Sequence, residues 1–179
     1  LSGQQVGVTG HSLGGHLAMI TSRLAPSMVN AVYTYNVPGF DTPFRTNLFP
    51  LTSEGFFDLL RAAPIGPITG AIGTSWNSQI MSHLNVPGDV VHDIGHTPGV
   101  QQIIFSESAN QGVIDAHDKV PLTDTLGLYS LFATLDPTVS VATVSSILEA
   151  SAAKSDKSLE NALDSLRTLF QENYAFGSP

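Results

Sequence analysis

The sequence lacks cysteine entirely and holds few positive charges, and both shortages exclude whole classes of function. Without cysteine there is no disulfide framework, no thiolate metal site and no cysteine nucleophile. Seven Lys and Arg residues against fifteen Asp and Glu residues give a formal net charge of -8. Nucleic acid requires clustered positive charge, so the composition argues against a nucleic-acid partner and against electrostatic docking on anionic membranes.

Long apolar runs are also lacking. No run approaches the roughly 20 residues that a membrane-spanning helix needs, and no basic start followed by an apolar stretch marks a signal peptide. Hydrophobic residues still make up 42% of the 179 residues, a globular composition long enough to bury a core. Because the chain begins at Leu1 and opens almost directly into a strand-like run, we expect it to be a piece of a longer protein.

The first forty residues have the pattern of two strands joined by a helix. Residues 5–9 are a β-rich run, 10–15 form a turn punctuated by glycine, and 16–25 have a helical pattern that Pro26 ends. Residues 29–37 read as the next strand. A strand, helix and strand in this order are typical of a parallel sheet.

The rest of the chain continues with both kinds of element. We expect strands over 81–86 and 100–106, and helices over 122–135, 139–153 and about 159–174. Thr123 or Asp124 is the expected cap of the helix over 122–135. Residues 40–82 are rich in Phe, Leu, Ile, Pro and Gly, which suits either a mobile apolar cap that binds acyl chains or a buried helix pair.

The turn after the first strand holds the pattern G-x-S-x-G, with Ser12 at its centre. This pattern places a serine at the tip of a sharp strand-to-helix turn, in a strained backbone conformation. We expect Gly10 and Gly14 to let strand and helix approach because they lack a Cβ, and Gly15 to let the helix lie close to the sheet. The backbone N–H of Leu13, at the start of the helix, would donate to a developing oxyanion. The alternative is a glycine-rich turn with an idle serine.

Two stretches around this turn resemble a known family. VTGHSLGGHLA (residues 8–18, here called the elbow) is similar to the elbow of the lipase class 3 family and related bacterial lipases. VYTYNVPGFD (32–41) resembles the strand that follows in that family. DAHDKVPLTDTLGLYSLF (115–132) resembles hydrolase modules of large secreted bacterial proteins with calcium-binding repeats, although the chain contains no such repeat. The likeness is specific over about residues 6–41 and looser over about 83–132.

The resemblance implies an α/β class protein with a partial α/β-hydrolase fold: a mostly parallel sheet flanked by helices, with a helical C-terminal tail. Residues 1–135 would form the half of the domain that carries the elbow, with 40–82 as a cap or lid. Residues 136–179 would be the tail, packed on that half or following it. The parent protein would be secreted by a bacterium.

In such hydrolases the acid follows the serine and the histidine comes last. Asp89 follows the predicted strand over 81–86, and Asp89-Val90-Val91 resembles the lipase segment in which an Asp-x-Val pair follows a strand. Asp89 is therefore the expected acid, which would accept a hydrogen bond from the imidazole and fix its tautomer. Asp93 is the alternative acid. Asp89 also fits an ordinary turn aspartate after Pro-Gly.

Six histidines compete to be the base. Chain order disfavours the three that precede the acid, which are His11, His16 and His83. Two others, His92 and His96, follow the acid closely. From the same loop as the acid, the imidazole of either would hardly reach Ser12.

His117 lies beyond one more predicted strand and before a helix that we expect to start near Leu122. The late histidine of the resembled hydrolases lies there, so His117 is the expected base, with His96 the next choice. A solvated loop histidine is the alternative for His117. His11 and His96 are candidates for lining the site.

A rival cluster follows the third predicted strand. Asp89, His92, Asp93 and His96 are spaced so that a helix would place all four on one face, as metal ligands. Gly95 within the segment makes a regular helix doubtful there. The spacing of the four residues still leaves a structural metal-binding domain as a third interpretation. No metal is assigned to the catalytic reaction.

The leading interpretation is a serine hydrolase that cleaves carboxylic esters, above all lipids, and needs no cofactor. Ser12 would attack the carbonyl, His117 would move the proton and Asp89 would orient His117. The second oxyanion donor would come from sequence outside this chain. Since strand 5–9 should be central in a full sheet, we expect it to pair with a missing N-terminal half or with another copy. The alternative function is a non-catalytic interaction or assembly module on the same scaffold.

Overall fold

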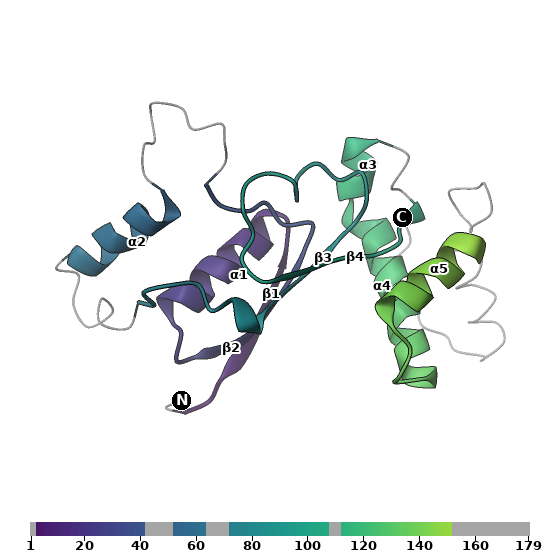
Figure 1. Cartoon of the computed structure of the whole chain (residues 1–179), viewed down its shortest axis with the longest axis horizontal. Coiled ribbons are helices and arrows are strands. Elements are labelled where there is room, and N and C mark those ends of the chain that lie inside the picture. The colour runs from purple at the N-terminus through teal and green to yellow at the C-terminus, as the bar shows by residue number, and fades with distance from the viewer. Residues whose placement is uncertain (1–2, 42–51, 64–71, 108–111, 152–179) are drawn as a thin grey trace. The chain divides into compact units, whose positions relative to one another are not determined.

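The computed structural model describes residues 3–41, 52–63, 72–107 and 112–151 (Figure 1). The chain divides into two compact units. The first comprises Leu1–Asn85 with Asp89–Ile103, and the second comprises Val86–Gly88 with Ile104–Pro179. The division of the chain into residues 1–135 and a tail over 136–179 stays a prediction, and the helix expected over about 159–174 lies outside the described residues.

A four-stranded parallel sheet organises the first unit. Its strands are paired in the order β1 (Val6–His11), β2 (Val29–Tyr35), β3 (Met81–Asn85) and β4 (Val100–Ile103). All three neighbouring pairs are parallel, which confirms the α/β class. The carboxyl ends of all four strands therefore meet at one edge of the sheet, where open α/β proteins bind their ligands.

Strand β1 runs to His11, past the predicted end at residue 9. It lies at an edge of the sheet and pairs with β2 alone among the described residues. The pairing of its outer edge with a further strand stays a prediction.

Helix α1 (Leu13–Leu24) connects β1 to β2 and packs on the sheet. It starts at Leu13 rather than residue 16 because Ser12 is its N-cap, so Gly14 and Gly15 lie within the helix. Its buried positions recur at steps of three and four, as expected for a helix with one face on a core: they are Gly15, Ala18, Met19, Ser22 and Arg23. Ala18 and Met19 belong to a hydrophobic core that also contains Val29, Val32, Val37, Phe40 and Met81.

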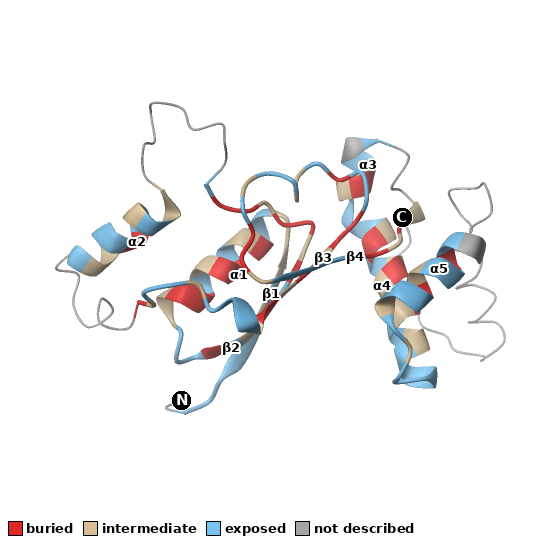
Figure 2. Ribbon diagram, viewed as in Figure 1, coloured by how far each residue is buried: buried red, intermediate tan, exposed pale blue. Residues whose placement is uncertain are grey.

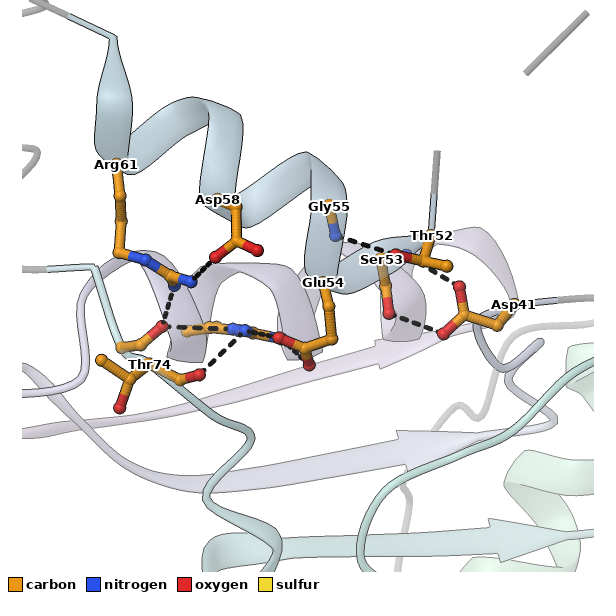
Figure 3. Close-up of polar contacts among 10 residues, drawn as sticks. Asp41, Thr52, Ser53, Glu54, Gly55, Asp58, Arg61 and Thr74 are labelled. Carbon is orange, nitrogen blue, oxygen red and sulfur yellow. Dashed lines mark hydrogen bonds and ion pairs between the residues drawn. The ribbon is translucent and has the colours of Figure 1, made fainter. Parts of the chain in front are cut away.

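Helix α2 (Ser53–Ala62) lies in the segment for which the sequence left two readings. The Thr52 side chain caps it by accepting a hydrogen bond from the Gly55 N–H, at 2.9 Å. Asp41 binds the same end, since its carboxylate accepts from the N–H and from the hydroxyl of Ser53, at 2.7 and 2.8 Å. Figure 3 shows these contacts at the start of the helix. A short 3-10 turn, η2 (Ser78–Ile80), leads into β3.

The second unit contains three described helices, α3 (Val113–His117), α4 (Lys119–Leu135) and α5 (Val141–Ser151). Asp118 caps α4, so the expected caps Thr123 and Asp124 are wrong and lie inside the helix. The sequence pattern missed this start because Pro121 stands in the first turn, where a helix tolerates proline. The core of the unit is formed by Leu128, Val144 and Leu148. None of the helices in the described part of the chain is long and apolar enough to cross a membrane.

Candidate active site

Ser12 occupies the turn between β1 and α1 in a conformation that few residues other than glycine adopt. Its backbone angles are φ 53 and ψ -128. Its N–H donates to the Tyr35 carbonyl at 2.9 Å, and its own carbonyl accepts from Gly15 N and His16 N at 2.9 and 3.2 Å. A strained non-glycine backbone costs about 1–3 kcal/mol and persists only where its surroundings enforce it. The predicted strained serine turn is therefore present.

The glycines of the elbow have different roles. A Cβ on Gly10 would lie 2.3 Å from the Gly14 carbonyl carbon, and one on Gly15 would lie 2.9 Å from the Gly10 carbonyl oxygen and 3.0 Å from the Thr34 Cβ. A Cβ on Gly14 would meet nothing within 4 Å. Gly10 and Gly15 thus allow the close packing of strand and helix. The prediction that Gly14 must lack a Cβ is wrong, because its backbone faces Gly10 while its Cβ position is open.

The backbone N–H of Leu13 is the first of α1. The first N–H groups of a helix have no acceptor within the helix, and the helix dipole makes this end favourable for negative charge. Leu13 directly follows Ser12, so its N–H is placed at the helix start as an oxyanion donor requires. The Leu13 side chain is 64% exposed and gives the turn an apolar outer surface.

Asp89 follows β3 after a turn in which Gly88 has φ 84. It is completely buried, and its Oδ1 accepts a hydrogen bond from the Val91 N–H at 2.8 Å. Since β1 and β3 are parallel, Ser12 and Asp89 both follow strands at the carboxyl edge of the sheet. A turn aspartate needs no such burial, and a buried carboxylate is costly unless it is paired. The hydrogen bond from the N–H two residues on is that of a turn aspartate, and the role of Asp89 as the acid stays a prediction.

The alternative acid, Asp93, lies in a different environment. Its side chain is 76% exposed, and its Oδ1 lies 3.3 Å from His92 Nε2. Solvent around such a carboxylate screens its charge and weakens its hold on an imidazole. Asp93 therefore suits the role of the acid less well than Asp89.

His117, the expected base, belongs to the second unit, whereas Ser12 and Asp89 belong to the first. It is the last residue of α3 and half-buried, so the alternative of a solvated loop histidine is wrong. Only Asp118 separates it from α4, and the Asp118 Oδ1 accepts from the Val120 N–H at 3.1 Å. The backbone of a histidine between two helices samples fewer conformations than that of a histidine in a long loop. This favours a fixed position of the imidazole.

The two histidines expected to line the site differ in how they are held. His11 ends β1 directly before Ser12 and is half-buried. His96 is exposed, and its backbone forms an antiparallel bridge with Phe40: each N–H donates to the other carbonyl, at 2.7 and 2.8 Å. The bridge ties the loop after β2 to the loop after β3 at the edge of the sheet that carries Ser12. His96 is thus held at this edge by its backbone, and its role in lining the site stays a prediction.

Comparisons with protein-family models, with curated proteins and with solved structures find no match.

The metal cluster expected as a rival has no support in the geometry. The segment from Asp89 to His96 forms turns and bends rather than a helix, and Gly95 adopts φ 77. Across the described ranges, no group of three or more His, Asp or Glu side chains is arranged to hold a metal ion. The two acids and two histidines therefore do not lie on one face of a helix, and the metal-binding interpretation is not supported.

His83 has a structural role that sequence reasoning missed. It is fully buried in β3, and its Nε2 lies 2.7 Å from the Pro98 carbonyl, which can only accept a hydrogen bond. Nε2 therefore carries the proton, and Nδ1 accepts from the Thr34 hydroxyl at 2.6 Å. Burial lowers the pKa of His83 below its ordinary value, against the opposing effect of the hydrogen bond to Pro98. This neutral histidine links β2, β3 and the loop before β4.

We expect the lowered pKa of His83 to make stability depend on pH in a defined window. The folded chain binds the His83 proton more weakly than the unfolded chain, whose pKa is about 6.5, so this contribution is complete above about pH 6.5 and is lost as the pH falls below it. The slope is at most about 1.4 kcal/mol per pH unit. Urea unfolding at about pH 7.5 and about pH 5.5 should show a smaller loss for His83→Gln than for the wild type. Equal losses would contradict this account.

A second group missed from the sequence is the buried Arg23 near the end of α1. Its side chain is completely buried and binds the Glu54 carboxylate of α2 with both terminal nitrogens. Its guanidinium carbon also lies 4.2 Å from the centre of the Phe57 ring and 4.8 Å from that of Trp76. Arg23 also donates to the Thr74 carbonyl at 3.3 Å, and Figure 3 shows Glu54 of α2 on the side of the helix toward Thr74. Arg23 therefore fixes α2 to the helix that follows the serine.

An aromatic stack continues from Arg23 to the first turns of α1. Trp76 lies 4.4 Å from Phe40 between ring centres, and Phe40 lies 4.2 Å from His16. His16 Nδ1 donates to the Pro38 carbonyl at 3.1 Å, and its backbone N–H donates to Ser12. The stack thus joins α2 to the turn that holds the serine.

Loss of the Arg23 guanidinium should release α2. Arg23→Met removes the ion pair and the cation–ring contacts and leaves the Gly73 and Thr74 carbonyls without this donor. We expect a loss of about 3 kcal/mol in the free energy of unfolding. Trp76 is the only tryptophan of the chain, so its emission should move to longer wavelength as the stack opens. Unchanged emission and stability would show that Arg23 does not hold α2.

Proposed function

We propose that this chain is a serine hydrolase of partial α/β-hydrolase fold that cleaves carboxylic esters, with lipids as the preferred class. The main support is the backbone of Ser12, strained at φ 53 and ψ -128 between a strand and a helix N-terminus. A serine without a function would not offset the free-energy cost of this strained backbone. A nucleophilic serine benefits from the strained turn, because the turn exposes its hydroxyl.

The proposed reaction proceeds through an acyl-enzyme. The Ser12 hydroxyl oxygen attacks the ester carbonyl carbon while His117 accepts its proton, and the Leu13 N–H stabilises the resulting oxyanion. His117 then gives the proton to the departing alcohol as the ester bond breaks. Water enters, loses a proton to His117 and attacks the acyl group, which leaves as a carboxylic acid while Ser12 regains its proton. Asp89 holds the imidazole in the required tautomer.

The order of the residues along the chain supports this assignment. Ser12 follows β1, Asp89 follows β3, and the chain enters the second unit at Ile104, directly after β4. We propose that this second unit supplies His117 to the edge of the sheet where the serine and the acid lie. The serine, acid and histidine would then come from three separate segments in the order that such hydrolases use.

The preference for lipids is supported by the surface around the serine. Leu13 and Leu17 lie one turn apart on α1 and are 64% and 53% exposed. Exposed leucines beside a nucleophile favour substrates with apolar acyl groups. The net charge of -8 disfavours strongly anionic substrates.

Release of p-nitrophenol from esters of increasing acyl length tests the proposal. We expect turnover by the full chain that increases with acyl length and disappears after treatment with a fluorophosphonate, which phosphonylates activated serines with loss of fluoride. Turnover that survives fluorophosphonate would point to another nucleophile. A complete lack of turnover and of fluorophosphonate reaction would favour the non-catalytic module.

A further inference from the structure

Residues 89–99, here called the acid loop, begin with the proposed acid Asp89 and lead into β4. The acid loop belongs to the same compact unit as the serine turn. The bridge between Phe40 and His96 holds its middle. Its last two residues, Pro98 and Gly99, lie against β3 at the buried His83. The end of the acid loop is therefore held from within the sheet.

Gly99 lets the acid loop approach β3 closely. Its φ is 119, and an added Cβ would lie 2.6 Å from the Met81 Cβ and 2.8 Å from His83 Nε2. Directly before it, the carbonyl of the buried Pro98 accepts a hydrogen bond from His83 Nε2 at 2.7 Å. Figure 2 shows buried residues along β3 beside the exposed β4. The imidazole of His83 is thus the interior donor that holds the acid loop.

The opposite side of the imidazole is connected to the serine turn. His83 Nδ1 accepts a hydrogen bond from the Thr34 hydroxyl at 2.6 Å. Thr34 lies beneath α1, because a Cβ on Gly15 would be 3.0 Å from the Thr34 Cβ. The Gly15 N–H in turn donates to the Ser12 carbonyl at 2.9 Å. A line of contacts therefore runs from the serine turn through Thr34 and His83 to the acid loop.

We propose that His83 is a positioning residue of the hydrolysis reaction, which sets the place of the acid loop relative to Ser12. The proposal rests on the proposed function, since it gives His83 a part in placing Asp89. One ring nitrogen donates and the other accepts, so the neutral imidazole with its proton on Nε2 is the form that fits. A displacement of about 1 Å, even one caused far from the reacting atoms, can lower a rate about 100-fold. His83 thus affects the rate without contacting the substrate.

A positive charge on His83 would disrupt this arrangement. A protonated Nδ1 no longer accepts the hydrogen bond from Thr34, and a buried cation is costly unless an anion pairs with it. Burial lowers the pKa of His83, and no neighbouring charge contributes to the shift. We therefore expect the acid loop to lose its interior donor as the pH falls below about 6.5.

The surroundings of the ring offer no compensating charge. In the described part of the chain, the neighbours from β2, the acid loop and β4 are uncharged: they are Thr34, Gly99 and Gln101. The titratable side chains of α1 are bound elsewhere, His16 to the Pro38 carbonyl and Arg23 to Glu54.

Ester kinetics of the full chain test this role. At about pH 8, His83→Leu should lower kcat for a p-nitrophenyl ester about 10- to 100-fold and change KM much less, because the acid loop loses its donor. His83→Gln keeps an N–H donor in place of Nε2 and should retain kcat within about threefold. Its kcat should also fall less steeply toward acid pH than that of the wild type, since one fewer group takes up a proton.

Val32→Ala is the matched control for a loss of stability. Val32 is a fully buried residue of β2 that belongs to the core with Ala18 and Met19. The change weakens the same sheet without removing a hydrogen bond to the acid loop. We expect the folded variant to keep the kcat of the wild type.

Hydrogen exchange measures the placement of the acid loop without reference to activity. The Val91 N–H donates to Asp89 Oδ1, and the His96 N–H donates to the Phe40 carbonyl. In His83→Leu at about pH 7.5, both amides should exchange at least about tenfold faster than in the wild type. The amides of β1 should change less.

Four results would overturn the role of His83. These are equal exchange of the two amides in His83→Leu and the wild type, a wild-type kcat in His83→Leu, an equally steep acid limb in His83→Gln, and a loss of kcat in Val32→Ala as large as that in His83→Leu. A wild type with neither turnover nor a fluorophosphonate adduct would be a different failure: it would overturn the proposed function, and the positioning role with it.

Discussion

Replacing Ser12 with alanine should lower the rate of ester hydrolysis by a factor of about 10⁴ or more, with the fold retained. The change removes the only atom that forms the acyl-enzyme and leaves the strained backbone of the turn in place. Rates with a p-nitrophenyl ester and circular dichroism measure the two effects. Ser130→Ala, at an exposed position of α4, is the control and should keep full activity. A rate for Ser12→Ala within about tenfold of the wild type would exclude Ser12 as the nucleophile.

The proposed partners of Ser12 make the losses non-additive. His117→Ala should lower the rate by a similar factor, and Ser12→Ala/His117→Ala should be no slower than Ser12→Ala alone, because the groups act as one unit. Asp89→Asn should also lose activity, since the imidazole tautomer is no longer fixed. Independent, multiplying losses for Ser12 and His117 would contradict a shared proton transfer and would assign the base to another histidine, with His96 first among them.

Gly10→Ala should be among the most destabilising single substitutions in the first unit, with a loss of about 3 kcal/mol or more in the free energy of unfolding. Its new Cβ would lie 2.3 Å from the Gly14 carbonyl carbon and 2.5 Å from Gly15 N, both of which are backbone atoms. A flexible side chain could move away from such a contact, but the helix backbone cannot without leaving the sheet. Urea unfolding compared with the wild type measures the loss.

Gly14→Ala is the matched control at the other glycine of the motif. Its Cβ would enter open space within α1, where alanine is a better helix former than glycine. We expect unchanged stability or a gain of up to about 1 kcal/mol. Two equally destabilised variants would mean that the Cβ position of Gly10 is no more crowded than that of Gly14.

The strands and helices near the elbow could be predicted because their signals are local. Alternating apolar residues, with glycine and proline at the turns, predict the ends of β1, α1 and β2 to within a few residues of their observed bounds. The start of α1 at Leu13 was missed because Gly14 and Gly15 read as turn residues, although the packing of Gly15 on Thr34 holds them in the helix. A glycine pattern alone does not distinguish a turn from a closely packed helix.

The roles that depend on contacts distant in sequence could not be predicted. Arg23 reads as an ordinary basic residue near a helix end, and its ion pair with Glu54 spans 31 positions. His83 reads as one of six candidate bases, and only its burial between Thr34 and Pro98 marks it as structural. The serine turn was predictable because its glycines and serine lie within five residues. The joining of Ser12 with Asp89 and His117 stays a prediction.

Mass spectrometry of the chain after reaction with a fluorophosphonate tests whether Ser12 is an activated nucleophile. We expect one adduct per chain, located on the peptide that contains Ser12, and none in Ser12→Ala or in the chain unfolded in urea before reaction. An adduct on any other serine, or equal labelling of the folded and the unfolded chain, would contradict the claim that the strained turn makes Ser12 a nucleophile.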